Sequence, residues 1–261
     1  MHYDAVMATL PFRDTHFIGR EEFARRWALA KEPSPDDARG PRLKLLLREF
    51  LWPLEPVRRR FGKSLEIVPA AHPQTVMLLP GFGAHPIRMR WMARRLEEAG
   101  HVAKRWGLGY NMGATADRFA RVEERLLALA RRHGQPIVLV GWSLGGVMAR
   151  ELAKKHPDKV SKVVTMGSPF SGSPRANNGW RAYQAIAGHR VDEPEIDTVV
   201  AEKPPVETVA IWSPCDGVVH PKSACGKPDE RDRAVAVRCS HMGLVMTNEA
   251  MAVVLKELDR A

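Results

Sequence analysis

The chain has 261 residues, of which 44% are hydrophobic and 27% are charged. This composition is globular, with enough apolar residues for a sizeable core, and it excludes disordered and fibrous proteins. The net charge of +10 favours anionic partners. No zinc-finger, basic-region or RNA-recognition pattern accompanies that charge, so we expect no nucleic-acid binding. Runs such as Arg94–Arg95 and Arg131–Arg132 are interpreted as solvated helix faces.

Three cysteines, Cys215, Cys225 and Cys239, are too few and too irregular for a disulfide framework, and no C-x-x-C pair suggests a metal. The N-terminus carries acids early and lacks the basic and apolar regions of a secretory signal. No apolar stretch approaches the ~20 residues of a membrane-spanning helix. We therefore expect a cytoplasmic protein.

Residues 1–64 are rich in charge, tryptophan and proline, and we predict a helical N-terminal extension there. Within it, residues 42–61 combine leucines, aromatics and arginines, a composition that suits peripheral contact with an anionic membrane. Pro53 and Pro56 interrupt that segment. The favoured interpretation is therefore a helical cap packed on the core, or a dimer contact. Residues 65–70 (LEIVPA) suggest an extra edge strand.

From residue 75 onward, short apolar runs alternate with amphipathic stretches, which predicts an α/β domain with a mainly parallel sheet and helices on both faces. The domain is expected to span 65–261. The predicted strands lie at 75–81, 101–106, 136–142, 162–168, 207–213 and 234–239. The predicted helices lie at 86–99, 114–133, 144–155 and 248–258.

The strongest motif is Gly141-Trp142-Ser143-Leu144-Gly145, which matches G-x-S-x-G between a β-branched strand and a helix-forming stretch. A nucleophilic serine on a strained strand-to-helix turn needs glycines on both sides, because side chains would collide there. The helix that follows favours negative charge developing beside the serine. Ser143 is therefore the predicted nucleophile.

A serine nucleophile needs a general base and a carboxylate that orients it. The expected chain order is serine, acid, base, with the partners just after late strands. Asp216 follows the strand at 207–213, and His241 follows the strand at 234–239. His220, four positions after Asp216, is the main rival base. The rival acids Asp192, Asp197, Asp229 and Asp232 lack a preceding apolar strand.

Two backbone N–H groups are needed to hold an oxyanion. One should belong to Leu144, directly after the nucleophile, and the other to the loop after the first strand. That loop reads Pro80-Gly81-Phe82-Gly83, so Phe82 is the predicted second donor.

LLPGFG, VGWSLGG, PCDGVV and SHMGL occur in this order, and together they resemble the α/β-hydrolase superfamily, in particular bacterial lipase- and esterase-like members. The resemblance covers about residues 75–258. It implies the α/β-hydrolase fold, a Ser143–Asp216–His241 triad and no cofactor. A bond between Cys225 and Cys239 would join the acid and base loops, but reduced thiols are the favoured interpretation in a reducing cytosol.

Residues 170–206 interrupt the strand–helix rhythm and are predicted to be a lid insertion, with Trp180, Tyr183, Ile186 and Ala187 as its apolar face. Trp180 and Tyr183, together with Trp142 and His220, are the predicted substrate contacts. The expected activity is hydrolysis of a small-molecule or lipid-like acyl ester. Acyl transfer and thioester cleavage by the same triad stay open, as does a membrane- or partner-binding protein on a hydrolase shell. A dehalogenase is disfavoured because it would carry a carboxylate at the turn.

Overall fold

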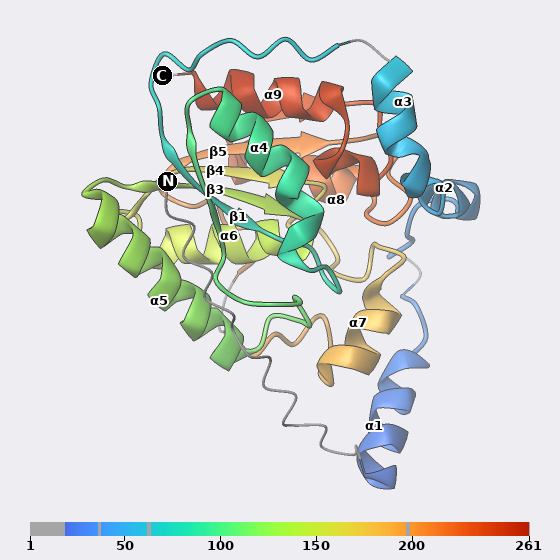
Figure 1. The fold of residues 1–261 in the computed structure, drawn as a ribbon. Coiled ribbons are helices and arrows are strands. Elements are labelled where there is room, and N and C mark those ends of the chain that lie inside the picture. The colour runs from blue at the N-terminus through green and yellow to red at the C-terminus, as the bar shows by residue number, and fades with distance from the viewer. Residues whose placement is uncertain (1–18, 36–37, 62–63, 197–198, 261) are drawn as a thin grey trace.

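The structure, a computed structural model, describes residues 19–35, 38–61, 64–196 and 199–260. The N-terminal peptide and Asp197, both used in the sequence predictions, lie outside these ranges. The described strands form one parallel sheet in the order β2-β1-β3-β4-β5-β6 (Figure 1). They are β1 (Thr75–Leu79), β2 (Val102–Arg105), β3 (Ile137–Trp142), β4 (Val160–Met166), β5 (Glu207–Trp212) and β6 (Arg233–Ala236).

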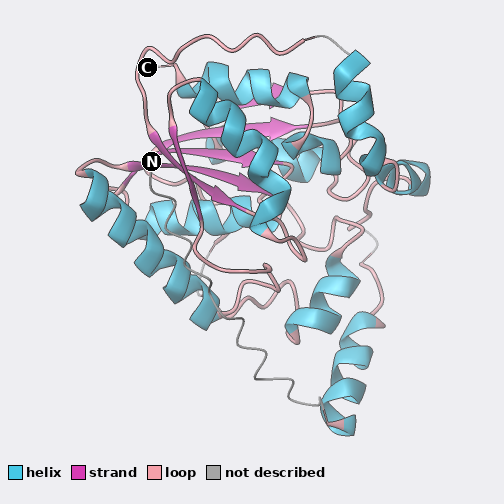
Figure 2. Ribbon diagram, viewed as in Figure 1, coloured by secondary structure: helices cyan, strands magenta, loops and turns pink. Residues whose placement is uncertain are grey.

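Helices cover both faces of this sheet (Figures 1 and 2). Val138 and Val140 of β3 pack on one face, and Ile137 and Leu139 pack on the other, as alternation along a strand requires. The first face is covered by α4 (Arg90–Glu98) and α9 (Asn248–Leu258), and the second by α5 (Ala116–His133) and α6 (Leu144–Lys155). Burial on both faces explains why the central strands are continuous apolar runs. The predicted α/β architecture is confirmed.

The described residues also form shorter helices. They are α7 (Trp180–Ala187), α8 (Pro221–Cys225), η1 (Trp52–Leu54), η2 (Pro86–Met89), η3 (Pro228–Glu230) and η4 (Met242–Val245).

The extra edge strand at residues 65–70 was a wrong prediction. This segment runs without regular structure, and Ala70 N–H donates to Ala99 O at 2.7 Å rather than entering a ladder. Pro69 has no N–H to give to a neighbouring strand, so a continuous ladder is not available there.

The N-terminal region contains α1 (Arg20–Ala30), α2 (Leu43–Glu49) and α3 (Glu55–Phe61). In α2 and α3 the buried side chains are Glu49 and Glu55. Apolar side chains of this region point outwards instead: Phe50 is 74% exposed and Phe61 is 83% exposed. Whether this extension acts as a cap on the core or as a dimer contact stays a prediction.

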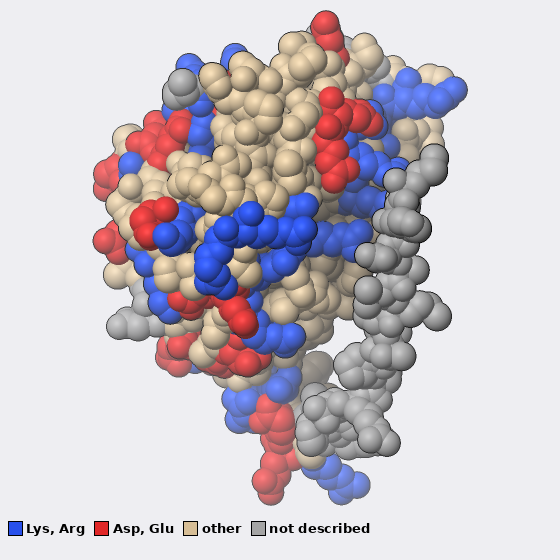
Figure 3. All heavy atoms as spheres, turned by 60° about the vertical axis from the view of Figure 1, so that its left-hand side comes forward, with Lys and Arg blue, Asp and Glu red and all other residues tan. Residues whose placement is uncertain are grey.

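Lys and Arg side chains are spread over the surface among acidic ones, and on the face drawn in Figure 3 they gather in a band across the middle. The paired arginines Arg94–Arg95 and Arg131–Arg132 belong to α4 and α5, as predicted for helix faces. Within the described ranges, no helix has the length and apolarity needed to cross a membrane.

Candidate active site

Ser143 stands at the turn between β3 and α6 in a strained conformation, with φ 54° and ψ −125°. Among the described residues it is the one non-glycine residue with positive φ. Its N–H donates to Met166 O at 2.8 Å, and its carbonyl accepts from Gly146 N at 2.9 Å. A Cβ on Gly141 would lie 2.4 Å from Gly145 O. The glycines of the motif are thus required by the close approach of strand and helix, as the pattern predicted.

The loop after β1 lies directly beside Ser143. A Cβ on Gly81 would come within 3.1 Å of the Ser143 Cβ. Because β1 and β3 are neighbours while β2 lies on the outer side of β1, this is the point where the strand order reverses. Open α/β sheets bind ligands at that point, at the carboxyl ends of the strands.

The two predicted oxyanion donors, Phe82 and Leu144, flank this position. Leu144 is the first residue of α6, so its N–H has no acceptor inside the helix. No described residue accepts the Phe82 N–H. Their role as an oxyanion hole stays a prediction.

Asn111 braces the loop after β1. Its side-chain amide donates to Pro80 O at 2.7 Å, and its backbone carbonyl accepts from Gly83 N at 2.7 Å. The residue is fully buried. A lone asparagine in a glycine-rich stretch gives no sequence signal for this role.

Asp216 and His241 form a buried pair at the ends of β5 and β6. Nδ1 of His241 lies 2.7 Å from Oδ2 of Asp216, and the residues are 3% and 0% exposed. The other oxygen, Oδ1, accepts from Val218 N and Val219 N, both at 2.8 Å. The carboxylate is thereby fixed with one oxygen directed at the imidazole.

Burial alone would lower the pKa of His241. The negative charge of Asp216, the hydrogen bond to it and the charge of Glu49 outweigh burial, so the pKa is raised above its ordinary value. A base supported in this way accepts a proton more readily than a free histidine.

Gly167, just after β4, lies against the same pair. Its φ is +60°, and a Cβ there would lie 3.0 Å from Asp216 Oδ2 and 3.1 Å from His241 Nδ1. Sequence reasoning treated this glycine as the end of a strand. Its contact with the pair depends on how β4 and β5 are placed side by side.

Trp142 and His220, two of the predicted substrate contacts, have other contacts in the structure. Trp142 is 3% exposed, and its indole N–H donates to His241 O at 3.2 Å. It therefore supports the base loop from within the core. His220 accepts from Lys222 N at 3.2 Å and lines a cleft of about 720 Å³ with residues such as Ser171 and Trp212. Ser143, Asp216 and His241 do not line that cleft, and substrate binding by Trp142 and His220 stays a prediction.

The other two predicted contacts lie on α7. Trp180 and Tyr183 are buried, while Ile186 is exposed. The Tyr183 hydroxyl accepts from Ala114 N at 3.2 Å and lies 2.9 Å from His189 Nε2. This helix is thus packed on the loops beside the site.

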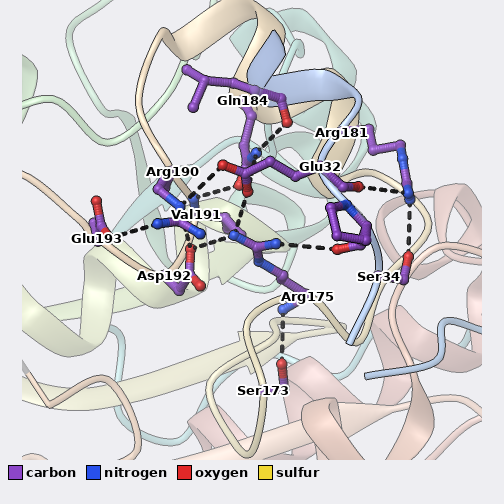
Figure 4. Close-up of polar contacts among 12 residues, drawn as sticks. Glu32, Ser34, Ser173, Arg175, Arg181, Gln184, Arg190, Val191, Asp192 and Glu193 are labelled. Carbon is purple, nitrogen blue, oxygen red and sulfur yellow. Dashed lines mark hydrogen bonds and ion pairs between the residues drawn. The ribbon is translucent and has the colours of Figure 1, made fainter. Parts of the chain in front are cut away.

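A buried arginine ties the segment that contains α7 to α1 (Figure 4). Arg175, 5% exposed, lies 2.6 Å from a Glu32 oxygen and 3.0 Å from an Asp192 oxygen. Gln184 of α7 donates to Leu29 O at 2.7 Å. Charged contacts therefore hold this segment against the N-terminal helix, and its role as a lid stays a prediction.

Cys215, Cys225 and Cys239 are free thiols, so the acid and base loops are not joined by a disulfide. Burial raises the pKa of the Cys239 thiol far above its ordinary value, which keeps it protonated. In the described part of the chain, His, Cys, Asp and Glu side chains do not gather in threes that could hold a metal ion.

Comparison with known proteins agrees with this architecture. A family profile described as alpha/beta hydrolase fold matches residues 75–190. A gene product of Listeria innocua matches with a TM-score of 0.53 and 17% identity, over 73% of this chain and 95% of that one. A 2-hydroxy-6-oxo-6-phenylhexa-2,4-dienoate hydrolase from Rhodococcus matches with a TM-score of 0.53 and 17% identity, over 72% and 91%. The chain therefore has the α/β-hydrolase fold.

Some relatives that match in sequence are named as methyl ester esterases. A pimeloyl-[acyl-carrier protein] methyl ester esterase of Vibrio cholerae is 33% identical over 115 residues, which is 42% of this chain and 42% of the relative. A protein of the same name from Aromatoleum aromaticum is 39% identical over 56 residues, 22% of each chain. The chain thus matches less than half the length of these relatives.

Proposed function

We propose that this protein is a serine esterase that cleaves carboxylic esters through an acyl-enzyme on Ser143. The observation that carries the proposal is the buried contact of 2.7 Å between His241 Nδ1 and Asp216 Oδ2, at the same sheet edge as a serine held at positive φ. If the pair of His241 and Asp216 served only to stabilise the fold, it would not need a strained serine on a glycine-flanked turn at the same sheet edge.

In the proposed reaction, the Ser143 hydroxyl attacks the ester carbonyl while His241 takes its proton. The C–O bond to the alcohol then breaks, and the imidazolium returns the proton to the leaving alcohol. Water next attacks the acyl-enzyme while His241 takes its proton. The bond between the acyl carbon and Ser143 Oγ then breaks, the imidazolium returns the proton to Ser143 Oγ, and the carboxylic acid is released. Asp216 stabilises the imidazolium, and the N–H groups of Phe82 and Leu144 hold the oxyanion.

The proposed substrate is an acyl ester with a small alcohol part. Methyl ester cleavage by the Vibrio relatives supports a small leaving group. Tyr183 and Phe82, whose rings lie 5.1 Å apart between α7 and the loop after β1, are proposed to provide apolar wall for the acyl chain.

The direct test uses a fluorophosphonate probe and a series of p-nitrophenyl esters of increasing acyl length. We expect the parent protein to be labelled and active, and Ser143→Ala to show neither property. Ser168→Ala is the matched control, because Ser168 is a buried serine at the end of the neighbouring strand. Equal labelling of the parent and Ser143→Ala would overturn the proposal.

A second proposal concerns the outward face of α2 and α3, which is favoured by its exposed apolar side chains. Leu47 is 61% exposed and Phe50 is 74% exposed, and the exposed arginines Arg42 and Arg48 flank them. Apolar side chains among cations suit the surface of an anionic bilayer. We propose peripheral contact with such a surface.

Flotation with phosphatidylserine-containing vesicles tests this second proposal, with vesicles of phosphatidylcholine alone as the comparison. Binding to the anionic vesicles should be reduced in a Leu47→Ser, Phe50→Ser double variant. If the parent protein does not float with anionic vesicles, the proposed membrane contact is wrong.

A further inference from the structure

Glu49 is the last residue of α2, and its carboxylate is buried at the base of the candidate site. The residue is 6% exposed. Oε1 accepts from His241 N at 2.7 Å and from Gly217 N at 2.8 Å, and Oε2 accepts from Met242 N at 3.0 Å. A carboxylate with three backbone donors is held firmly, and it holds the donors firmly in return.

These three donors belong to the two loops that carry the acid and the base. Gly217 directly follows Asp216, and His241 is the base itself. The main chain of α2 also presses on the acid loop, since a Cβ on Gly217 would lie 2.4 Å from Leu45 O. One side chain from the N-terminal helices therefore fixes the spacing between the acid and base loops.

The charge of Glu49 acts on the same imidazole. The charged groups that act on His241 are Asp216, from the loop after β5, and Glu49, from α2; burial opposes both by lowering the pKa. Cys239, on the chain just before His241, is kept neutral by its burial. Asp216 is thus supplemented by a second carboxylate, which contacts the backbone of the base loop.

We propose that Glu49 is a positioning residue for His241, which holds the base loop against the acid loop and favours the imidazolium formed during catalysis. The proposal rests on the esterase activity proposed above. Glu49 does not touch the reacting atoms, so its effect should appear in the rate and its pH dependence, and little in substrate binding.

The chain supplies a matched control in Glu55 of α3. This glutamate is also buried, at 8% exposure, and lies in the same N-terminal region. Its partner is Arg58, at 3.0 Å, and within the described residues its side chain makes no hydrogen bond to the acid or base loops. Loss of its charge tests the effect of any buried glutamate in these helices.

The experiment compares the parent with Glu49→Gln, Glu49→Asp and Glu55→Gln, measuring kcat, KM and melting temperature for a p-nitrophenyl ester across pH. Glu49→Gln should lower kcat about 10- to 100-fold, the size expected for losing hydrogen bonds to a charged group. KM should change less than about threefold, because uniform substrate binding is untouched.

The pH dependence of kcat/KM distinguishes a Glu49 that positions His241 for catalysis from a Glu49 that only stabilises the fold. Removing the Glu49 charge lowers the pKa of His241, so the acid limb of kcat/KM should move to lower pH in Glu49→Gln. Glu49→Asp keeps the charge and should leave that limb in place while losing part of kcat. Glu55→Gln should change the melting temperature at most.

A lower melting temperature in Glu49→Gln with kcat and the acid limb unchanged would reduce Glu49 to a structural anchor and overturn the inference. If Glu49→Gln does not fold, Glu49→Asp decides: reduced kcat with an unmoved limb supports it, and parental kcat refutes it. An inactive, unlabelled parent protein would instead be a failure of the proposed esterase function.

Discussion

The ring of Tyr183 lies 5.1 Å from the ring of Phe82, centroid to centroid, at an interplanar angle of 55°. Through this contact α7 supports the loop whose N–H is the proposed oxyanion donor. We therefore expect the segment around α7 to affect the geometry at Ser143.

Tyr183→Ala should lower kcat/KM about tenfold, because it removes an aromatic contact worth ~1 kcal/mol that supports the loop of the proposed oxyanion donor. Tyr183→Phe keeps the ring and loses only the hydroxyl contacts to Ala114 and His189, so its loss should stay below about threefold. Steady-state kinetics with one p-nitrophenyl ester check the pair. Parental kinetics in Tyr183→Ala would show that α7 does not support the loop.

Gly167→Ala should abolish most activity. A Cβ at this position would push on Asp216 and His241 and lie 2.5 Å from Leu244 Cδ1. Gly172→Ala is the matched control, since Gly172 also has positive φ but has open space around it. Both variants carry a backbone strain of ~1–2 kcal/mol. If kcat falls equally in both, strain accounts for the loss and contact with the pair does not.

The raised pKa of His241 predicts opposite pH trends for activity and stability. The imidazole must be neutral to take the Ser143 proton, so kcat/KM should rise as pH increases through the pKa of His241 in the folded protein. The stabilisation from the raised pKa is complete below the unfolded value of about 6.5 and is lost as pH rises through the folded value.

The free energy of unfolding of the parent and of His241→Gln measures this stability trend. The advantage of the parent over the variant should shrink as pH increases across that window. A difference that is constant, or that grows with pH, would contradict the raised pKa.

Arg175→Met should destabilise the segment around α7. The variant leaves the carboxylates of Glu32 and Asp192 without their buried partner, at a cost of about 1–3 kcal/mol. Hydrogen exchange at the amides of α7 should become faster, and the melting temperature should fall. Arg190→Met is the control, because Arg190 is 40% exposed and such pairs contribute about 0–1 kcal/mol. Equal protection in the Arg175 variant and the parent would show that other contacts hold α7.

The order of strands and helices from residue 75 onward could be predicted closely, because apolar runs and glycine stops are local signals. The helix at 248–258 agrees with α9 at both ends. The strand ends also placed Asp216 beside His241, since parallel strands bring their carboxyl ends to one edge.

Glu49 could not be predicted in the same way. Its hydrogen bonds to Gly217 and His241 join residues 168 and 192 positions apart. The local pattern also pointed the other way, because a leucine-rich helix suggests buried leucines and exposed glutamates. Glu49 is buried instead because three backbone N–H groups in two distant loops donate to its carboxylate. These groups come together only in the folded chain.

The buried glutamates of α2 and α3 also determine where the chain can be truncated. Residues 75–190 match the family profile, and a boundary near residue 64 is the one that the sequence predicts for isolating the candidate hydrolase domain. Such a cut would remove the acceptor of three backbone N–H groups in the acid and base loops. During synthesis, the contact between Glu49 and His241 also has to wait until residue 241 has been made. The candidate site is therefore completed only after segments 192 residues apart have both been made.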